Sequence, residues 1–388
     1  MEWRGHRINP SRLPGGDRAA VWPGRREAPV GSGAGTMRAA LRTATAVLAA
    51  VALAGPVWSQ GTIVHDSLRS AALAGNLTGD SPVREVVIYL PPSYQTAVSR
   101  RYPVLYMLHG FTSTPDEWLD GTYDGLDLRV AMDSLIAAHA TGEFIVVIPN
   151  VDTKLGGGFY TDSPTTGGWA TFLVHDLLAF IDGRYRTMSE RRARALAGHS
   201  MGGFGTLVLG FGHPELFGML YALSPCCTTF VGGLAPTSPA WRAAAKATSW
   251  PVAGAPPGTA PVVALAAALS PDPGPGRWYG QLPFEPDSTG QLRPVPEVRA
   301  RWEARMPIGL IPTLVAGPDA PPALVIEFGL QDVPNVVPGS LALATALASA
   351  GVPSMVLTYT GGHVDRQRQR ISAHLLPTIG RWFQSAPP

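Results

Sequence analysis

The sequence predicts an α/β fold with a mostly parallel central sheet, helices on both faces, and an insertion over the face where the strands end. Short apolar runs alternate with segments whose apolar residues recur at helical spacing. Strands that alternate with helices favour a parallel sheet covered on both sides, because each connection returns across one face. The length of 388 residues suffices for one large domain of this class.

The first part of the chain has the pattern of segments that precede a folded domain. Residues 1–36 are rich in Arg, Pro and Gly and lack hydrophobic periodicity, so we expect them to lie upstream of the true start. Residues 37–59 combine a basic start, an uncharged apolar run and a small residue at Ser59. This pattern predicts a secretory signal peptide and a secreted or periplasmic protein without a stable membrane anchor, with an uncleaved anchor as the alternative.

We expect residues 60–388 to form the folded domain. The predicted strands are 61–73, 83–90, 102–108, 144–148, the run ending at His199, 219–223, 323–328 and 353–359. The predicted helices are 126–138, 169–185, 204–210, 339–350 and 366–383. The near-continuous apolar runs indicate strands buried on both faces, whereas 83–90 alternates in part, as an edge or antiparallel strand does.

Residues 228–318 interrupt this alternation and are dense in Pro, Gly and Ala. A structureless segment of this length is uncommon inside a compact domain. We therefore interpret it as an insertion that contains some helices and covers the upper face of the sheet.

Charge and cysteine content exclude several classes of function. The formal charge of +2 comes from the first 42 residues, with eight Arg and three acids, so the rest is slightly acidic and nothing indicates a nucleic-acid partner. The two cysteines, Cys226 and Cys227, are adjacent and can close only a small strained ring, so we expect packing rather than chemistry. Asp124 and Asp127 are too few for a calcium loop. No metal or cofactor is expected.

The segment Gly198-His199-Ser200-Met201-Gly202 lies between a predicted strand and a predicted helix. A Gly-x-Ser-x-Gly turn in this context presents the serine hydroxyl at the edge of a parallel sheet, and the glycines allow strand and helix to approach closely. Ser200 is therefore the candidate nucleophile. The alternative is a glycine-rich turn with an idle serine.

A serine nucleophile needs a base and an acid, which should follow later strands because parallel strands end at one edge. His363 follows the last strand after two glycines and is the candidate base. The side chain of His199 should point away from Ser200 because of the turn and should pack nearby. Asp332, four residues past 323–328, is the candidate acid. Glu327 competes but lies inside the strand and should face a helix layer. Two further histidines lie on predicted helices, His175 and His374.

The backbone N–H groups of Met201 and Phe111 are the candidate donors to an oxyanion. Met201 begins the helix after the turn, and Phe111 follows Gly110 at the end of strand 102–108. Five aromatic side chains are candidates for a platform that binds a phenolic or sugar ester, with Trp118, Tyr160 and Trp169 as the main substrate-binding candidates: Trp118, Tyr160, Trp169, Trp278 and Tyr279.

Several segments together resemble one known family. They are residues 90–94 (LPPSY), 102–111 (YPVLYMLHGF), 198–203 (GHSMGG), 329–332 (GLQD) and 361–363 (GGH). They look like the α/β-hydrolase family that includes esterase D, feruloyl esterases and antigen 85 mycolyltransferases. The resemblance implies an α/β-hydrolase fold, a triad of Ser200, Asp332 and His363, and an oxyanion hole from the Phe111 and Met201 amides. The insertion's composition and the cysteine pair depart from the family.

The sequence thus predicts a secreted serine carboxylic-ester hydrolase that forms an acyl-enzyme on a small-molecule or polymer-attached ester. An acyltransferase on the same triad is the first alternative, and a binding module that has lost catalysis is a remote one. The insertion should wall the pocket, so the sequence predicts neither the acyl and alcohol specificity nor the oligomeric state.

Overall fold

A computed structural model describes residues 60–250, 255–256, 258–272 and 279–385. The predicted upstream segment and signal peptide, residues 1–36 and 37–59, lie outside these residues. Within the described part, no helix is both long enough and apolar enough to cross a bilayer.

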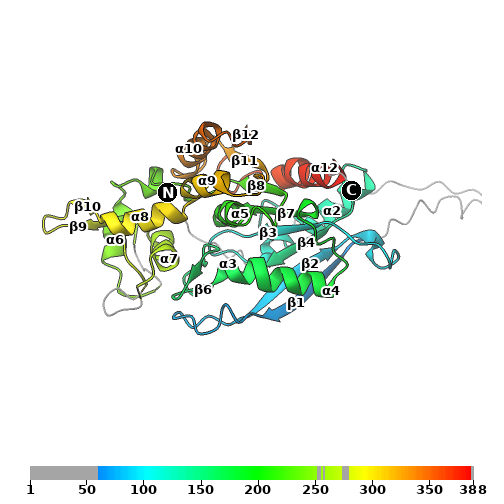
Figure 1. Cartoon of the computed structure of the whole chain (residues 1–388), viewed down its shortest axis with the longest axis horizontal. Coiled ribbons are helices and arrows are strands. Elements are labelled where there is room, and N and C mark those ends of the chain that lie inside the picture. Colours follow the sequence, from blue (N-terminus) through cyan, green and yellow to red (C-terminus); the bar gives the residue numbers. More distant parts are fainter. Residues whose placement is uncertain (1–59, 251–254, 257, 273–278, 386–388) are drawn as a thin grey trace, which may run out of the picture. The chain divides into compact units, whose positions relative to one another are not determined.

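An eight-stranded sheet with the order β1-β2-β4-β3-β7-β8-β11-β12 organises the domain (Figure 1). Its strands are β1 (Thr62–Arg69), β2 (Val83–Leu90), β3 (Val104–Leu108), β4 (Ile145–Pro149), β7 (Arg194–His199), β8 (Met219–Leu223), β11 (Ala323–Gly329) and β12 (Met355–Tyr359). β2 pairs antiparallel with both β1 and β4, and the other pairings are parallel. This confirms the predicted α/β fold with a mostly parallel sheet.

Helices cover both faces of the sheet because each buried strand presents apolar side chains to both. In β3, Tyr106 belongs to one buried apolar cluster, whereas its neighbours Leu105 and Met107 belong to the other. The first cluster includes α5 (Met201–Gly212), α10 (Val336–Ser349) and the continuous helix formed by α3 (Trp169–Thr171), a π-helical segment (Phe172–Leu177) and α4 (Leu178–Arg184). The second includes α2 (Leu128–Ala137) and the C-terminal helix formed by α11 (Gln367–Arg370), a π-helical segment (Ile371–Leu375) and α12 (Leu376–Ser385).

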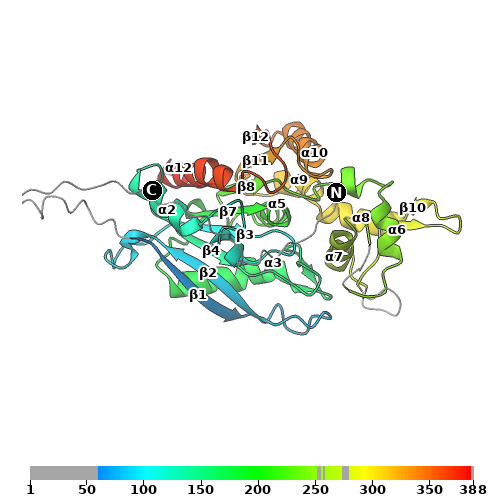
Figure 2. The same ribbon diagram turned by 180° about the vertical axis from the view of Figure 1, so that it is seen from behind.

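The insertion folds into helices and a hairpin around its own aromatic cluster. Its elements are α6 (Pro239–Ala245), α7 (Thr259–Leu269), α8 (Pro296–Arg305), α9 (Pro307–Ala316) and the pair β9 (Phe284–Pro286) and β10 (Leu292–Pro294). Phe230, Trp241, Phe284 and Trp302 stack or meet edge to face inside it. Figure 2 shows α6, α7, α8 and the hairpin grouped together beyond one end of the sheet, and α9 contacts α5.

The remaining short elements lie in the connections. They are the 3-10 turns Pro92–Tyr94, Pro115–Trp118, Arg191–Ala193 and Gly232–Leu234, and the two-residue strands β5 (Asp162–Ser163) and β6 (Gly167–Gly168).

Gly202 allows α5 to begin directly against the end of β3. A Cβ atom at this position would lie 1.9 Å from the carbonyl oxygen of Leu108, and a Cβ at Gly198 would lie 2.3 Å from the carbonyl oxygen of Gly202. Both contacts are with backbone atoms, which cannot rotate away. The predicted close approach of strand and helix at these glycines is therefore confirmed.

We expect Gly202→Ala to lower the free energy of unfolding by about 1–3 kcal/mol or more, because a backbone shift must relieve the clash with Leu108. Gly212→Ala is the matched control at the other end of α5, where a Cβ would meet no described atom within 4 Å. Urea unfolding of the two variants measures the difference. Equal stability of the two variants would contradict the account of how the turn is packed.

Candidate active site

Ser200 occupies the sharp turn between β7 and α5. Its backbone has φ 59° and ψ −115°, a conformation that is unfavourable for a residue with a side chain. Three backbone hydrogen bonds hold it: Ser200 N donates to Leu223 O at 3.0 Å, and Ser200 O accepts from Phe204 N at 3.0 Å and from Cys226 N at 3.2 Å. The strained conformation is thus supported by β8 and by the loop that follows it.

The structure brings the three predicted triad residues together. His363 Nε2 lies 2.8 Å from Ser200 Oγ, and His363 Nδ1 lies 2.7 Å from Asp332 Oδ1. Asp332 also accepts from Ser224 Oγ at 2.7 Å and from Val333 N at 2.6 Å. Because an ionised carboxylate only accepts, Nδ1 carries the proton and Nε2 is left to accept from the serine hydroxyl.

Asp332 stays ionised although its side chain has no exposed surface. Burial alone would raise the pKa of its carboxyl, but the hydrogen bonds from His363, Ser224 and Val333 hold the pKa below its usual value. An ionised carboxylate at this position favours the protonated form of His363. The site can therefore take a proton from Ser200.

Glu327, the competing acid, is engaged elsewhere. Its buried carboxylate on β11 accepts hydrogen bonds from the hydroxyl of Tyr221 and the guanidinium of Arg370, which belongs to α11. It therefore faces a helix layer, as its place inside the strand predicts. The Arg370 guanidinium lies 5.0 Å from the centre of the Tyr359 ring. This ion pair supports the strands beneath the site and does not contact His363.

The two predicted oxyanion donors lie beside Ser200. Met201 begins the helix α5, and Gly110, which precedes Phe111, lies close enough that a Cβ there would be 3.7 Å from Ser200 Cβ. Among the described residues, neither the Met201 N–H nor the Phe111 N–H has a hydrogen-bond acceptor. Free amides at a helix N-terminus favour negative charge.

Comparison with known proteins identifies the family. A family model described as "Putative esterase" matches residues 82–309. The chain belongs to this family. The matched residues contain Ser200 and Phe111 but end before Asp332 and His363. The assignment of the acid and the base therefore depends on their hydrogen bonds with each other and with Ser200.

Two curated relatives are named as esterases. The chain is 33% identical over 170 residues to an endo-1,4-beta-xylanase/feruloyl esterase of Xylanibacter ruminicola, covering 42% of this chain and 22% of that protein. It is 37% identical over 128 residues to an esterase of Mycobacterium tuberculosis, covering 31% of this chain and 25% of that protein. The chain thus spans about a quarter of the length of these relatives.

A solved structure shares the fold over most of the domain. A ferulic acid esterase superposes with a TM-score of 0.56 at 22% identity, covering 83% of this chain and 99% of that one. At this identity the likeness shows the α/β-hydrolase fold alone, which confirms the predicted fold class.

In this member of the esterase family, His109 and Tyr160 hold in place the loop that carries Phe111. Val151 N donates to His109 Nε2 at 2.8 Å, so Nδ1 carries the proton and donates to Gly110 O at 2.9 Å. The Tyr160 hydroxyl donates to His109 O at 2.8 Å. In addition, Thr112 N donates to Gly156 O at 2.7 Å. The glycine-rich loop after β4 therefore supports the loop that carries the Phe111 amide.

The core contains the three residues that the sequence predicts to bind substrate, Trp118, Tyr160 and Trp169. All three side chains have no solvent-accessible surface. Trp118 stacks on Tyr123 at 4.7 Å between ring centres, and Trp169 donates its indole N–H to Thr166 O at 2.8 Å. Large aromatic side chains bury the most apolar area, so they are favoured at core positions. Of the other two platform candidates, Tyr279 is also fully buried and Trp278 lies outside the described residues.

We expect Tyr160→Phe to lower both kcat and stability, the latter by about 1–3 kcal/mol, because the buried carbonyl of His109 loses its donor. Tyr106→Phe is the matched control: in the described structure its buried hydroxyl has no hydrogen-bond partner, so removing it should leave stability unchanged or higher. Ester hydrolysis and urea unfolding of both variants check this. The same behaviour in both would contradict a role for Tyr160 in supporting the loop.

Two side chains hold the backbone of His363. His199 Nε2 donates to His363 O at 2.8 Å, and Gln367 Nε2 donates to the same oxygen at 2.7 Å. His199 is buried, as its place in the turn predicts, and its ring centre lies 4.7 Å from that of His363. Sequence reasoning missed Gln367. The only sequence feature that could have identified Gln367 is its position in the predicted helix 366–383, four residues after His363.

Two histidines near the site remain neutral. Burial lowers the pKa of His109 to about 4, and burial, with the positive charge that His363 carries when it is protonated, lowers the pKa of His199 to about 3. Both values lie below the ordinary value near 6.5. In the unfolded chain these residues take up protons below pH 6.5, whereas in the fold they do not.

Stability should therefore fall as the pH drops from 6.5 to 5, by up to about 1.4 kcal/mol per pH unit for each of the two histidines. Urea unfolding at a series of pH values measures the slope. His199→Gln should reduce this slope, whereas His175→Gln, at an exposed position, should leave it unchanged. A slope that is the same in both variants would contradict neutral burial of His199.

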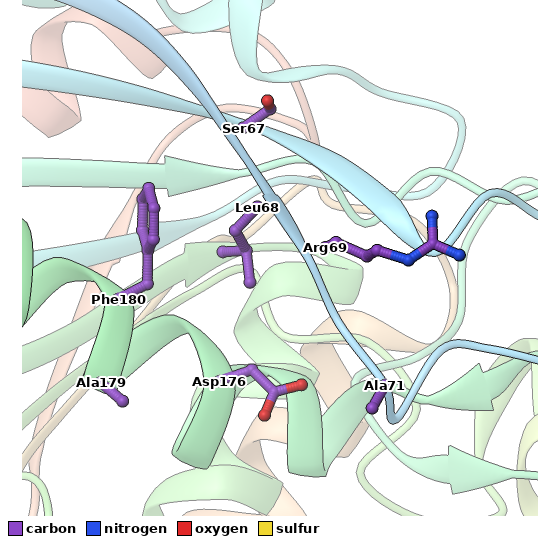
Figure 3. Close-up of a pocket in the computed structure, with 7 residues that line it drawn as sticks. All are labelled: Ser67, Leu68, Arg69, Ala71, Asp176, Ala179 and Phe180. Atoms are coloured by element: carbon purple, nitrogen blue, oxygen red, sulfur yellow. The ribbon is translucent and has the colours of Figure 1, made fainter.

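A surface cavity of about 540 Å³ lies away from the triad (Figure 3). Its lining comes from the continuous helix of α3 and α4, with Asp176, Ala179 and Phe180, and from β1 and the residues after it, with Ser67, Leu68, Arg69 and Ala71. In Figure 3, Leu68 points toward the helix. β1 is at the opposite edge of the sheet from β11 and β12, so this cavity does not serve Ser200. Within the described residues, no group of three or more His, Cys, Asp or Glu side chains is arranged to hold a metal ion.

Proposed function

We propose that the protein is a secreted serine carboxylic-ester hydrolase that acts through Ser200, His363 and Asp332. The hydrogen-bonded chain from Ser200 Oγ through His363 to Asp332 carries the proposal. Membership of the putative esterase family supports it.

In the proposed reaction, Ser200 Oγ attacks the ester carbonyl while His363 Nε2 accepts its proton. The carbonyl oxygen becomes negatively charged and is stabilised by the free N–H groups of Met201 and Phe111. His363 then gives the proton to the departing alcohol, leaving the acyl group on Ser200. A water molecule, deprotonated by His363, hydrolyses this acyl-enzyme.

Esters of hydroxycinnamic acids, free or attached to a polymer, are the proposed substrates. This proposal is supported by the words "feruloyl esterase" in the name of the Xylanibacter ruminicola relative, which is similar over 42% of this chain. A panel that pairs methyl ferulate with methyl esters of simple aliphatic acids varies the acyl group at a constant alcohol. Comparing methyl acetate with p-nitrophenyl acetate varies the alcohol at a constant acyl group. A protein that hydrolyses none of these esters would contradict the proposal.

The same panel distinguishes hydrolysis from acyl transfer. With a sugar acceptor added, a hydrolase still releases free acid as its main product, whereas a transferase forms the sugar ester. We expect the free acid to dominate. Secretion is tested by expressing the full chain and sequencing the N-terminus of protein recovered outside the cytoplasm, where a start at Gln60 is expected.

A further inference from the structure

The adjacent thiols of Cys226 and Cys227 lie beside the candidate nucleophile, in the loop that follows β8. Both side chains are buried and both thiols are free. Their sulfur atoms are 2.7 Å apart. A disulfide bond has a length of about 2.05 Å, so the two atoms need to approach by only about 0.7 Å to form one.

This loop is bonded to two members of the triad. Cys226 N donates to Ser200 O at 3.2 Å, and Ser224 Oγ donates to Asp332 Oδ2 at 2.7 Å. Ser224 has φ 45° and Cys227 has φ 61°, so two residues with side chains are held in the left-handed region within four positions. A change in the backbone at the cysteines is therefore transmitted to both the nucleophile and the acid.

We propose that Cys226 and Cys227 form a redox site, and that closing a disulfide between them lowers turnover at Ser200. The inference about turnover rests on the proposed esterase function. The oxidant is a small-molecule disulfide. One cysteine thiolate attacks it and releases one thiol, and the second thiolate then displaces the other, so two protons and two electrons leave the pair and two small thiols form.

The closed form is strained and therefore easily reduced. The Cα atoms of adjacent residues are about 3.8 Å apart across a trans peptide, whereas disulfides ordinarily join Cα atoms at about 4.4–6.8 Å. Strained disulfides have more oxidising potentials than structural ones and are the labile class. Burial raises the pKa of the Cys227 thiol, so Cys227 exchanges slowly at neutral pH and faster in mild alkali.

Closing the ring moves the backbone at Cys226, whose N–H supports the carbonyl of Ser200. Misplacing a reacting group by a fraction of an ångström lowers the rate of the chemical step while leaving substrate contacts largely intact. We therefore expect kcat to fall by between about tenfold and about 100-fold on oxidation, with KM changing less, and to recover on reduction.

The full-chain protein, equilibrated in buffers of graded oxidised and reduced glutathione, tests this. Intact mass after unfolding in denaturant and alkylation with iodoacetamide counts free thiols, because the buried thiols are then accessible. Folded aliquots of the same samples give kcat on p-nitrophenyl acetate. We expect molecules with two alkylated thiols to be replaced by molecules with none as kcat falls. Two outcomes overturn the proposal: thiols that stay alkylatable under the most oxidising buffer, or a disulfide that forms while kcat is unchanged.

Cys226→Ser and Cys227→Ser each remove the partner thiol while keeping its size, so kcat in either variant should not respond to the buffer. If neither variant folds, the wild-type titration alone decides. If the reduced protein hydrolyses no ester, the proposed function fails, and the thiol count still decides whether the redox pair exists. The rate at which a fluorophosphonate labels Ser200 then replaces kcat as the measure of its effect.

Discussion

Ser200→Ala is expected to lower kcat for ester hydrolysis by about 10⁴- to 10⁶-fold, because no other group replaces the attacking hydroxyl. The residual rate comes from the oxyanion donors and from substrate binding. Initial rates with p-nitrophenyl acetate measure the loss. The variant should remain folded, because alanine tolerates the turn as well as serine does and only the hydrogen bond to His363 Nε2 disappears.

Ser340→Ala is the matched control for this loss. Ser340 is fully buried, and its hydroxyl has no partner within the described residues. Its removal should leave kcat unchanged. If Ser200→Ala retained more than a small fraction of wild-type turnover in a preparation free of contaminating esterase, the assignment of the nucleophile would be wrong.

Asp332→Asn is expected to lower kcat by about 10⁴-fold. The asparagine amide keeps the shape of the carboxylate but can donate to His363 Nδ1. It therefore favours the tautomer whose proton is on Nε2, which cannot accept from Ser200. It also removes the negative charge that stabilises the imidazolium. Initial rates across a range of pH, with unfolding measured in parallel, separate this loss from a loss of fold.

Glu327→Gln is the comparison that distinguishes the two acids. Its carboxylate pairs with the partly buried Arg370, so its removal leaves an unpaired charge and should lower stability by about 3–5 kcal/mol. The fraction that stays folded should retain kcat within a few-fold of wild type. The opposite pattern, with chemistry lost in Glu327→Gln and kept in Asp332→Asn, would exchange the roles assigned to the two residues.

The positions of the strands along the chain and the segments that carry the triad residues are predictable because both follow from local patterns. Strands such as β3 and β4 are apolar throughout, since both of their faces are buried. Parallel strands end at the same edge, so the residues after β11 and β12 meet the turn after β7. The chemistry of a serine nucleophile then selects Asp332 and His363 from the residues at that edge.

Features that depend on tertiary contacts are not predictable in this way. The helix α7 is buried on nearly all sides, so its sequence lacks the polar face that reveals a helix. The first strand ends at Arg69 rather than residue 73, because the Asn76 side chain donates to the carbonyls of Leu73 and Asp80 and closes a turn. The aromatic side chains predicted to bind substrate lie in the core. The identity of an aromatic residue does not indicate whether its side chain is buried or lines a binding site.

The most direct test of the central claim is covalent labelling of the purified protein with a fluorophosphonate, followed by peptide mapping. An activated serine beside a base and free oxyanion donors reacts with this reagent, whereas an ordinary serine does not. We predict a single adduct on Ser200, lost in Ser200→Ala and strongly slowed in Asp332→Asn. Labelling at another residue, or no labelling of a folded protein, would show that Ser200 is not an activated nucleophile.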